Sequence, residues 1–125
     1  MRVGVLSDTH LSGYSDRLAE IYRHHLRDCD LILHAGDLTD LSVLDVFEGK
    51  PVRAVYGNMD PPEVRKHLPD KCVLEIGGHR VGLIHGWGSP FGIEQRILKA
   101  FDVLDCIVYG HTHQAANELR GLMRV

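Results

Sequence analysis

Short apolar runs that are typical of buried strands recur through the first half of the chain. Val3–Ser7 is mostly apolar and contains β-branched residues, and Leu31–Ala35 has a similar character. Both are predicted to be strands buried on both faces, as in parallel sheets. Val52–Tyr56 is predicted to be a third strand.

Helical patterns lie between these strands. Apolar residues recur at i, i+3, i+4 and i+8 in one segment, which predicts a helix with a single apolar stripe, started by Ser15 or Asp16. The stripe consists of Leu18, Ile21, Tyr22 and Leu26. A shorter helix is predicted to begin near Thr39 or Asp40 and to end at Gly49, where glycine and proline follow.

The second half of the chain adds a predicted hairpin. Val73–Ile76 and Arg80–Ile84 flank the sequence Gly77-Gly78-His79, which is typical of a tight turn. Apolar residues at helical spacing over 93–101 predict a further helix, and Cys106–Tyr109 is the last clear strand. The order of strands and helices predicts a layered α/β domain with parallel strands, to which the hairpin adds antiparallel ones. The 125 residues fit one domain, 1–125.

Polar clusters follow five of the predicted strands directly. In an open α/β sheet, ligand sites lie beyond the carboxyl ends of the strands, so these clusters are expected to meet in one place. The candidate site residues are Asp8, His10, Asp37, Asn58, His85, His111 and His113.

The chemistry of these side chains indicates a metal centre. Carboxylate, imidazole and carboxamide ligands without a thiolate suit manganese, iron, zinc or nickel. Seven ligands are too many for one ion, whereas two ions that share a bridging carboxylate would use them all. Such a pair, roughly 3.5–4 Å apart, can clamp a phosphoryl group.

The blocks D-x-H, G-D, G-N, H-G and G-H-T-H occur in this order along the chain. Together they resemble the calcineurin-like metallophosphoesterase superfamily, and the segments SDTH, HAGD and GHTH are similar to its small bacterial and archaeal phosphodiesterase branch. The resemblance implies a layered αββα sandwich of mixed sheets. Family members continue past G-H-T-H with more strands and an Asn-Pro-Gly-Ser turn, so C-terminal strands are expected to be missing from this chain.

The resemblance also implies a role for each candidate residue. The first metal would be held by Asp8, His10 and His113, and the second by Asn58, His85 and His111. Asp37 would bridge both ions. Two divalent ions are expected, with manganese favoured and nickel, iron and zinc as alternatives.

The implied activity is phosphodiester hydrolysis by in-line attack of a metal-bridging hydroxide. Asp8, Asp37, Asn58 and His85 would be the catalytic residues. Alternatives are a phosphomonoesterase, a dinucleoside-polyphosphate hydrolase, or a non-catalytic scaffold like the retromer subunit that has this fold.

One position departs from the family pattern. Many phosphatases of the superfamily carry a histidine directly after the G-N asparagine, as the acid for the leaving group. Here that position is Met59, which cannot donate a proton. Weak phosphomonoesterase activity and a preference for good leaving groups are therefore expected, unless Asp60 or His34 acts instead.

Composition limits the classes of molecule that the chain is expected to bind. The formal net charge is −3, there is no basic run, and no apolar run approaches the ~20 residues of a membrane span. A membrane protein and a strong nucleic-acid binder are thus not expected. The three cysteines are an odd number with no close pairing and no C-x-x-C motif, so they are expected to be apolar side chains in a reducing cytoplasm. The expected substrate is a small-molecule or nucleotide phosphodiester, and a homo-oligomer is left open.

Overall fold

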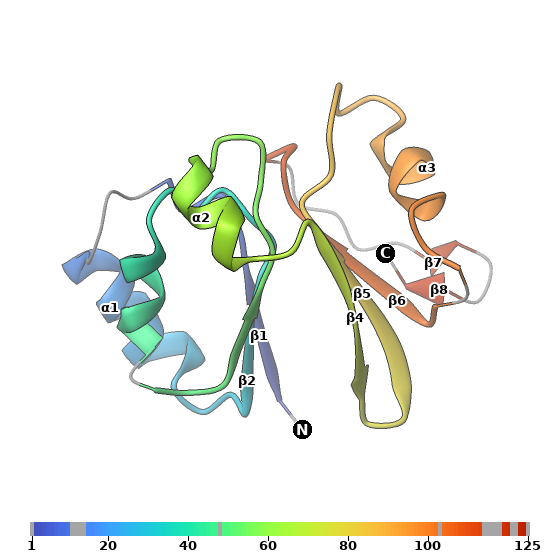
Figure 1. Cartoon of the computed structure of the whole chain (residues 1–125). Coiled ribbons are helices and arrows are strands. Elements are labelled where there is room, and N and C mark those ends of the chain that lie inside the picture. The colour runs from blue at the N-terminus through green and yellow to red at the C-terminus, as the bar shows by residue number, and fades with distance from the viewer. Residues whose placement is uncertain are drawn as a thin grey trace.

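Two β-sheets lie face to face between helices in the computed structural model (Figure 1). It describes residues 2–10, 15–47, 49–102 and 104–113, and the backbone of 119–120 and 123–124. The first sheet has the order β1-β2-β3 and is wholly parallel: β1 (Val3–Leu6), β2 (Leu31–His34) and β3 (Val52–Ala54). The second has the order β4-β5-β6-β8-β7: β4 (Lys71–Ile76), β5 (His79–Ile84), β6 (Cys106–Tyr109), β8 (Met123–Arg124) and β7 (Leu119–Arg120).

The second sheet is mixed. β5, β6 and β8 run parallel, whereas β4 pairs antiparallel with β5, and β7 with β8. The helices are α1 (Asp16–Ile21), the π-helical η1 (Tyr22–Leu26), the 3₁₀-helical η2 (Leu41–Phe47), α2 (Pro62–His67) and α3 (Ile93–Leu98). The predicted αββα sandwich is therefore confirmed, with the mixed strand directions in its second sheet.

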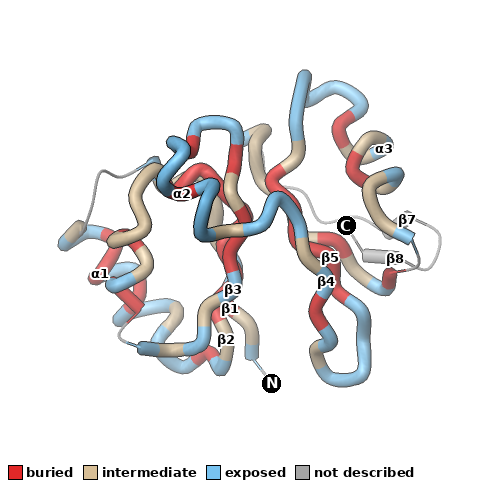
Figure 2. The backbone as a smooth tube through the Cα atoms, in the orientation of Figure 1, coloured by how far each residue is buried: buried red, intermediate tan, exposed pale blue. Residues whose placement is uncertain are grey.

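Three apolar layers hold this arrangement together, and Figure 2 shows buried stretches in both strands and helices. One lies between the first sheet and the α1–η2 helices and includes Ile32, Tyr22 and Phe47. The middle layer lies between the two sheets and includes Leu33 and Leu83. The third packs α3 onto the second sheet. Full burial of each large apolar side chain contributes roughly 1.5–3 kcal/mol.

The local predictions hold with corrections at particular residues. Ser15 caps α1, because its Oγ accepts a hydrogen bond from the backbone of Leu18. Ile21, predicted to lie in the apolar stripe, is 42% exposed. The helix widens to π-type spacing from Tyr22, which changes the face that successive residues present.

Strand β1 was predicted to be buried on both faces, and this is wrong. Val5 is 50% exposed, because β1 lies at the edge of its sheet. β2, the central strand of the same sheet, is buried as predicted from Ile32 to His34.

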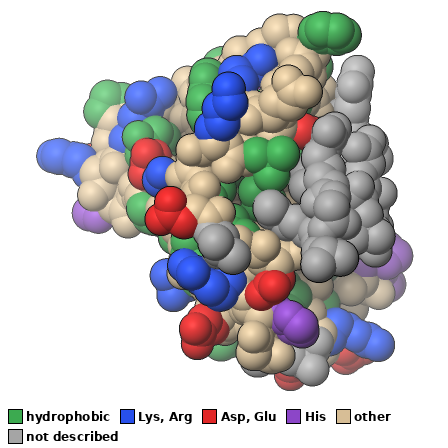
Figure 3. All heavy atoms as spheres, turned by 90° about the vertical axis from the view of Figure 1, so that its right-hand side faces the viewer, with side chains coloured by type: hydrophobic (Ala, Val, Ile, Leu, Met, Phe, Trp, Pro, Cys, Tyr) green, Lys and Arg blue, Asp and Glu red, His purple; other side chains and the backbone are tan. Residues whose placement is uncertain are grey.

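On the side of α3, the described residues form no patch of one charge sign. Basic and acidic side chains are scattered there among hydrophobic ones (Figure 3). No helix in the described part of the chain has the length and apolar character needed to cross a bilayer.

Candidate metal centre

The carboxyl ends of β1, β2, β3, β5 and β6 come together at one edge of the two sheets (Figure 1). The loops that leave these ends carry the candidate residues predicted from the sequence. The structure brings all seven into one cluster of contacts: Asp8, His10, Asp37, Asn58, His85, His111 and His113.

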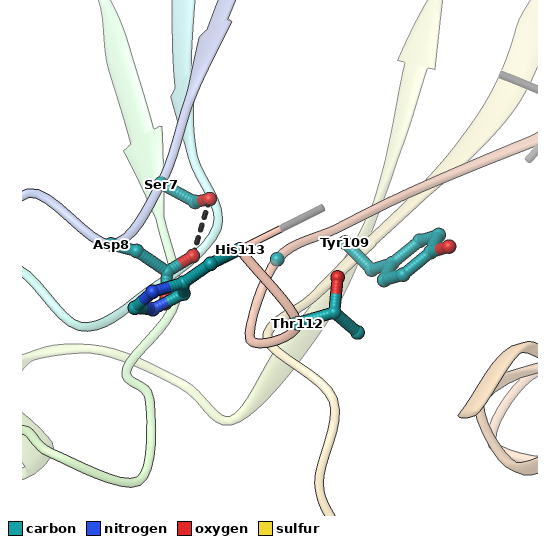
Figure 4. A pocket seen from close by; sticks show the side chains of 6 residues that line it. Ser7, Asp8, Tyr109, Thr112 and His113 are labelled. Carbon is teal, nitrogen blue, oxygen red and sulfur yellow. Dashed lines mark hydrogen bonds and ion pairs between the residues drawn. The ribbon is translucent and has the colours of Figure 1, made fainter. Parts of the chain in front are cut away.

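One part of this cluster, here called the first group, consists of Asp8, His10 and His113. Asp8 Oδ1 lies 3.2 Å from His113 Nε2 and 3.7 Å from His10 Nε2. The two imidazole rings meet edge to face, with centroids 5.5 Å apart. Figure 4 shows the His113 ring beside the Asp8 carboxylate. These three ligand atoms are close enough together to hold one ion.

The second group consists of Asn58, His85 and His111. Asn58 Oδ1 lies 3.0 Å from His85 Nε2 and 3.2 Å from His111 Nδ1. The rings of His85 and His111 again meet edge to face, at 5.1 Å. The carboxamide oxygen and the two ring nitrogens thus point at a common centre.

Asp37 lies between the two groups. Its Oδ2 is 3.6 Å from His10 Nε2 in the first group and 3.2 Å from His85 Nε2 in the second. Asp8 Oδ1 also approaches the second group, at 3.8 Å from His85 Nε2. Both carboxylates therefore lie between the two sets of histidines.

Two backbone carbonyls fix the histidine tautomers of the second group. The Ala35 carbonyl lies 2.8 Å from His85 Nδ1, and the Gly88 carbonyl lies 2.7 Å from His111 Nε2. A carbonyl only accepts, so each of these nitrogens carries the proton. The other nitrogen of each ring, Nε2 of His85 and Nδ1 of His111, faces Asn58 Oδ1 and is the atom that would bind a metal. This outward anchoring of an imidazole is common among metal ligands.

The polar atoms at the centre fit a cation. Ring nitrogens of two imidazoles lie 3.0–3.2 Å from a carboxamide oxygen or from Asp37 Oδ2. Asp8 Oδ1 is buried and has no hydrogen-bond partner among the described residues. Two carboxylates and a carboxamide oxygen gathered at one place cost free energy unless positive charge lies between them. The donor set therefore suits divalent metal ions.

The electrostatics of Asp8 keep it ionised. Burial acts to raise its pKa, but the hydrogen bond from Ser7, the charges of His85 and His113, and the His111 backbone N–H outweigh burial. The pKa of Asp8 is consequently held below its ordinary value of 3.8. The Ser7 hydroxyl donates to Asp8 Oδ2 over 2.6 Å, as Figure 4 shows. Ser7 was not predicted as a site residue, and its place just before Asp8 is the only signal for it.

Backbone strain is concentrated at the candidate ligands. Among the described residues, six other than glycine have positive φ, and five of these are candidate ligands: Asp8, His10, Asp37, His111 and His113. Each such conformation costs of order 1 kcal/mol and persists only where the surroundings impose it. The strand-end turns therefore hold ligand side chains at the expense of local backbone energy.

Two glycines allow the loops to approach the carboxylates. A Cβ at Gly110 would lie 2.6 Å from Asp8 Oδ2, and one at Gly57 would overlap the Asp37 carboxylate. Any other residue at either position would therefore displace a candidate ligand.

Asp60 is a structural residue, and the suggestion that it could act as the leaving-group acid is wrong. It is 3% exposed. Its Oδ2 accepts from the backbone of Asp37 at 2.9 Å and of Gly57 at 2.8 Å, and its Oδ1 accepts from Thr39 at 2.6 Å. The carboxylate thus ties the loop after β2 to the loop after β3.

His34 also lies beneath the site and cannot reach a substrate, so it too is excluded as the acid. It is fully buried. Its Nδ1 accepts from the Gly36 backbone at 3.1 Å, and its Nε2 lies 3.1 Å from Thr9 Oγ1. Burial lowers the pKa of His34 from 6.5 to about 4, with smaller opposing effects from nearby carboxylates. It is a neutral link between two ligand-bearing loops.

Met59 is 58% exposed, and its backbone N–H donates to Asp37 Oδ1 over 2.7 Å. Its side chain has no proton that it could donate to a leaving group. With Asp60 and His34 excluded, neither suggested substitute supplies the missing acid.

Comparison with known proteins agrees with this site. The family model described as the calcineurin-like phosphoesterase superfamily domain matches residues 1–125. The chain belongs to this superfamily. A probable metallophosphoesterase of Methanothermobacter thermautotrophicus is 42% identical over 117 residues, covering 91% of this chain and 67% of that protein. A second, from Methanocaldococcus jannaschii, is 37% identical, covering 90% of this chain and 59% of that protein. The chain thus spans only part of the length of these relatives.

Solved structures of the superfamily have a similar fold. A novel archaeal phosphodiesterase is 26% identical with a TM-score of 0.72, covering 99% of this chain and 81% of that one. Wild-type Vps29 from Entamoeba histolytica, solved in complex with Zn²⁺, is also 26% identical, with a TM-score of 0.72, covering 99% and 71%. This calcineurin-like phosphoesterase domain is thus similar both to an enzyme and to a Vps29 protein.

Proposed function

We propose that this phosphoesterase domain is a phosphodiesterase that works with two divalent metal ions, manganese favoured. One observation carries the proposal. Two sets of side chains that can bind metal meet at one sheet edge, and Asp37 Oδ2 lies beside both. The first group with Asp37 would hold one ion, and the second group with Asp37 would hold the other.

The residues of the centre suit an anionic substrate. Bound cations would lower the pKa of a water molecule and offset the charge that develops on the phosphoryl oxygens. Asn58 is uncharged. With asparagine rather than aspartate at this position, the second group and its ion would attract a phosphate more strongly. His85 is held by the Ala35 carbonyl and presents Nε2 without rearrangement.

The absence of an acid at position 59 favours diesters with good leaving groups. A leaving alkoxide of high pKa needs a proton from the protein, and Met59, Asp60 and His34 do not supply one. An aryl or otherwise stabilised leaving group departs without this help. We therefore favour phosphodiesters over phosphomonoesters as substrates.

The proposal is tested by counting ions and turnover together. The purified chain is loaded with manganese, and bound metal is measured by mass spectrometry. Hydrolysis of bis(p-nitrophenyl) phosphate is then compared with that of p-nitrophenyl phosphate. We expect two ions per chain and a higher kcat/KM for the diester. A higher value for the monoester would instead support the phosphomonoesterase alternative.

The similarity to Vps29 supports a second candidate, a binding module that does not turn over substrate. Two bound ions without hydrolysis of either ester would favour this candidate and contradict the first. The complete set of candidate ligands in this chain is the reason to favour the enzyme.

A further inference from the structure

A cavity of about 280 Å³ adjoins the second group and is not used by the chemistry described above. Asn58 and His85 form part of its wall, so a molecule in it would touch the candidate metal centre. Its other walls include Tyr56, Arg65 and Trp87. A substituent of a phosphate at the centre could therefore extend into this cavity without leaving the protein surface.

Arg65 of α2 is held beside the centre. Its Nε donates to the Asp60 carbonyl over 2.9 Å, and its Nη2 donates to the Asn58 carbonyl over 3.2 Å. The guanidinium also stacks over the Tyr56 ring, 5.2 Å from the centroid. Only two of its five N–H groups are used in these bonds among the described residues. A cation with a fixed orientation and spare donors suits a phosphate oxygen.

Trp87 gives the cavity an aromatic wall. It follows His85 and Gly86 and is 48% exposed, so a ligand in the cavity can reach its side chain. Arg96 fixes its backbone, because Arg96 Nε and Nη2 both donate to the Trp87 carbonyl, at 3.1 and 2.8 Å. An exposed indole on a fixed loop is a surface on which a nucleobase can stack.

A polar acceptor completes the cavity. Asp70 supplies a carboxylate, which can accept a hydrogen bond from a hydroxyl or an amino group. A cation, an aromatic face and an acceptor together match the phosphate, the base and the ribose or exocyclic amine of a nucleotide. A purely aliphatic diester would use neither the aromatic face nor the acceptor.

We propose that this cavity is a nucleoside subsite, in which Arg65 contacts the phosphate and Trp87 stacks on the base. The subsite rests on the proposed phosphodiesterase function, since it serves one ester arm of that substrate. The substrate class would then be a nucleoside phosphodiester.

Binding can be measured independently of turnover. Trp87 is the only tryptophan in the sequence, so the intrinsic fluorescence of the chain reports this cavity. We expect thymidine 5′-monophosphate to quench the emission of the metal-loaded protein, and inorganic phosphate to leave it nearly unchanged. Arg65→Ala should raise the Kd of the nucleotide about tenfold, and Arg65→Lys should not restore it, because lysine lacks the planar fork. Lys66→Ala, at the neighbouring exposed position on α2, is the matched control.

Turnover gives a second readout. The Trp87→Ala variant should lose about tenfold in kcat/KM for thymidine 5′-(p-nitrophenyl phosphate) but less than about twofold for methyl p-nitrophenyl phosphate. Phe91→Ala, which removes a 92% exposed aromatic outside the cavity, should change neither.

Several outcomes would overturn the subsite: unchanged emission at saturating nucleotide, equal Kd values for the Arg65→Ala and Lys66→Ala variants, or equal losses on both diesters. Quenching without any hydrolysis would support the subsite while contradicting the proposed enzymatic function.

Discussion

The two histidine pairs of the centre are held in different ways. In the second group, His85 and His111 each donate a ring N–H to a backbone carbonyl. In the first group, no described residue anchors the second ring nitrogen of His10 or His113. The side chain of His113 is 62% exposed and that of His10 is 34% exposed, whereas that of His85 is 3% exposed.

This difference predicts that two ions, if both groups bind one, would have unequal affinities. An anchored imidazole loses little rotational freedom when it binds a metal, whereas an exposed, unanchored one loses more. The second group is therefore pre-organised, and the first group can adapt to incoming substrate. We expect the two ions to bind in order, the second group filling first.

The largest effect is expected from Asp37→Ala, because Asp37 is the residue that the two groups share. The substitution removes a candidate ligand from both ions. Bound metal should fall to one ion or none, and kcat/KM should fall by more than the roughly 10–100-fold typical of an outer-shell change. Metal analysis and diester hydrolysis measure this, with His24→Ala on an exposed helix face as control. Two tightly bound ions at the full rate would refute the shared role.

A smaller effect is expected from Asp60→Asn, which weakens the hydrogen bonds that hold the loops of Asp37 and Asn58 together. One carboxylate oxygen becomes an amide N–H₂ that faces backbone donors of Asp37, Gly57 or Thr39. The free energy of unfolding, from urea titration, should fall by about 3 kcal/mol. Metal affinity should fall about 10–100-fold. A loss of activity with stability and metal affinity intact would show that Asp60 is an acid after all.

The gathering of the candidate residues could be predicted from the sequence, because each lies within a few residues of a strand end. Asp37 follows an apolar run after a glycine, and Asn58 follows another in the same way. Parallel strands bring their carboxyl ends to one edge, so the local pattern already implies the gathering of side chains. The alternation of strands and helices predicted a layered α/β domain, and the family resemblance implied its αββα layering.

The supporting contacts could not be predicted, because they depend on tertiary distances. The carbonyl that anchors His85 is 50 residues away in sequence, and the one that anchors His111 is 23 residues away. Arg65 follows no motif, and its position depends on how α2 packs. The exposure of Val5 depends on the order of strands in the sheet. β7 and β8 have two residues each, too few to show an alternating pattern.

The buried histidine His34 lies beneath both groups, and its titration can be tested through the pH dependence of stability. Its pKa is about 4 in the folded chain and ordinarily 6.5. Between these two pH values the unfolded chain binds more protons at this residue than the folded chain does. The free energy of unfolding therefore falls as the pH falls through this window. From pH 7 to pH 5 this one residue should cost about 2 kcal/mol. In His34→Asn, measured with a chelator present, the fall in unfolding free energy should be smaller by that amount. An unchanged pH dependence would contradict a buried neutral His34.

The comparison between the two groups is tested most directly by stepwise metal titration. Calorimetry with manganese should show two events whose Kd values differ by at least about tenfold, since anchoring of ligand histidines has effects of this size. His113→Ala removes an unanchored ring and should abolish the weaker event while leaving the tighter one. His85→Ala removes an anchored ring and should abolish the tighter event. If His113→Ala removed the tighter event instead, the order of filling would be reversed. Metal affinity would then depend more on the buried Asp8 carboxylate than on anchoring of the histidine rings.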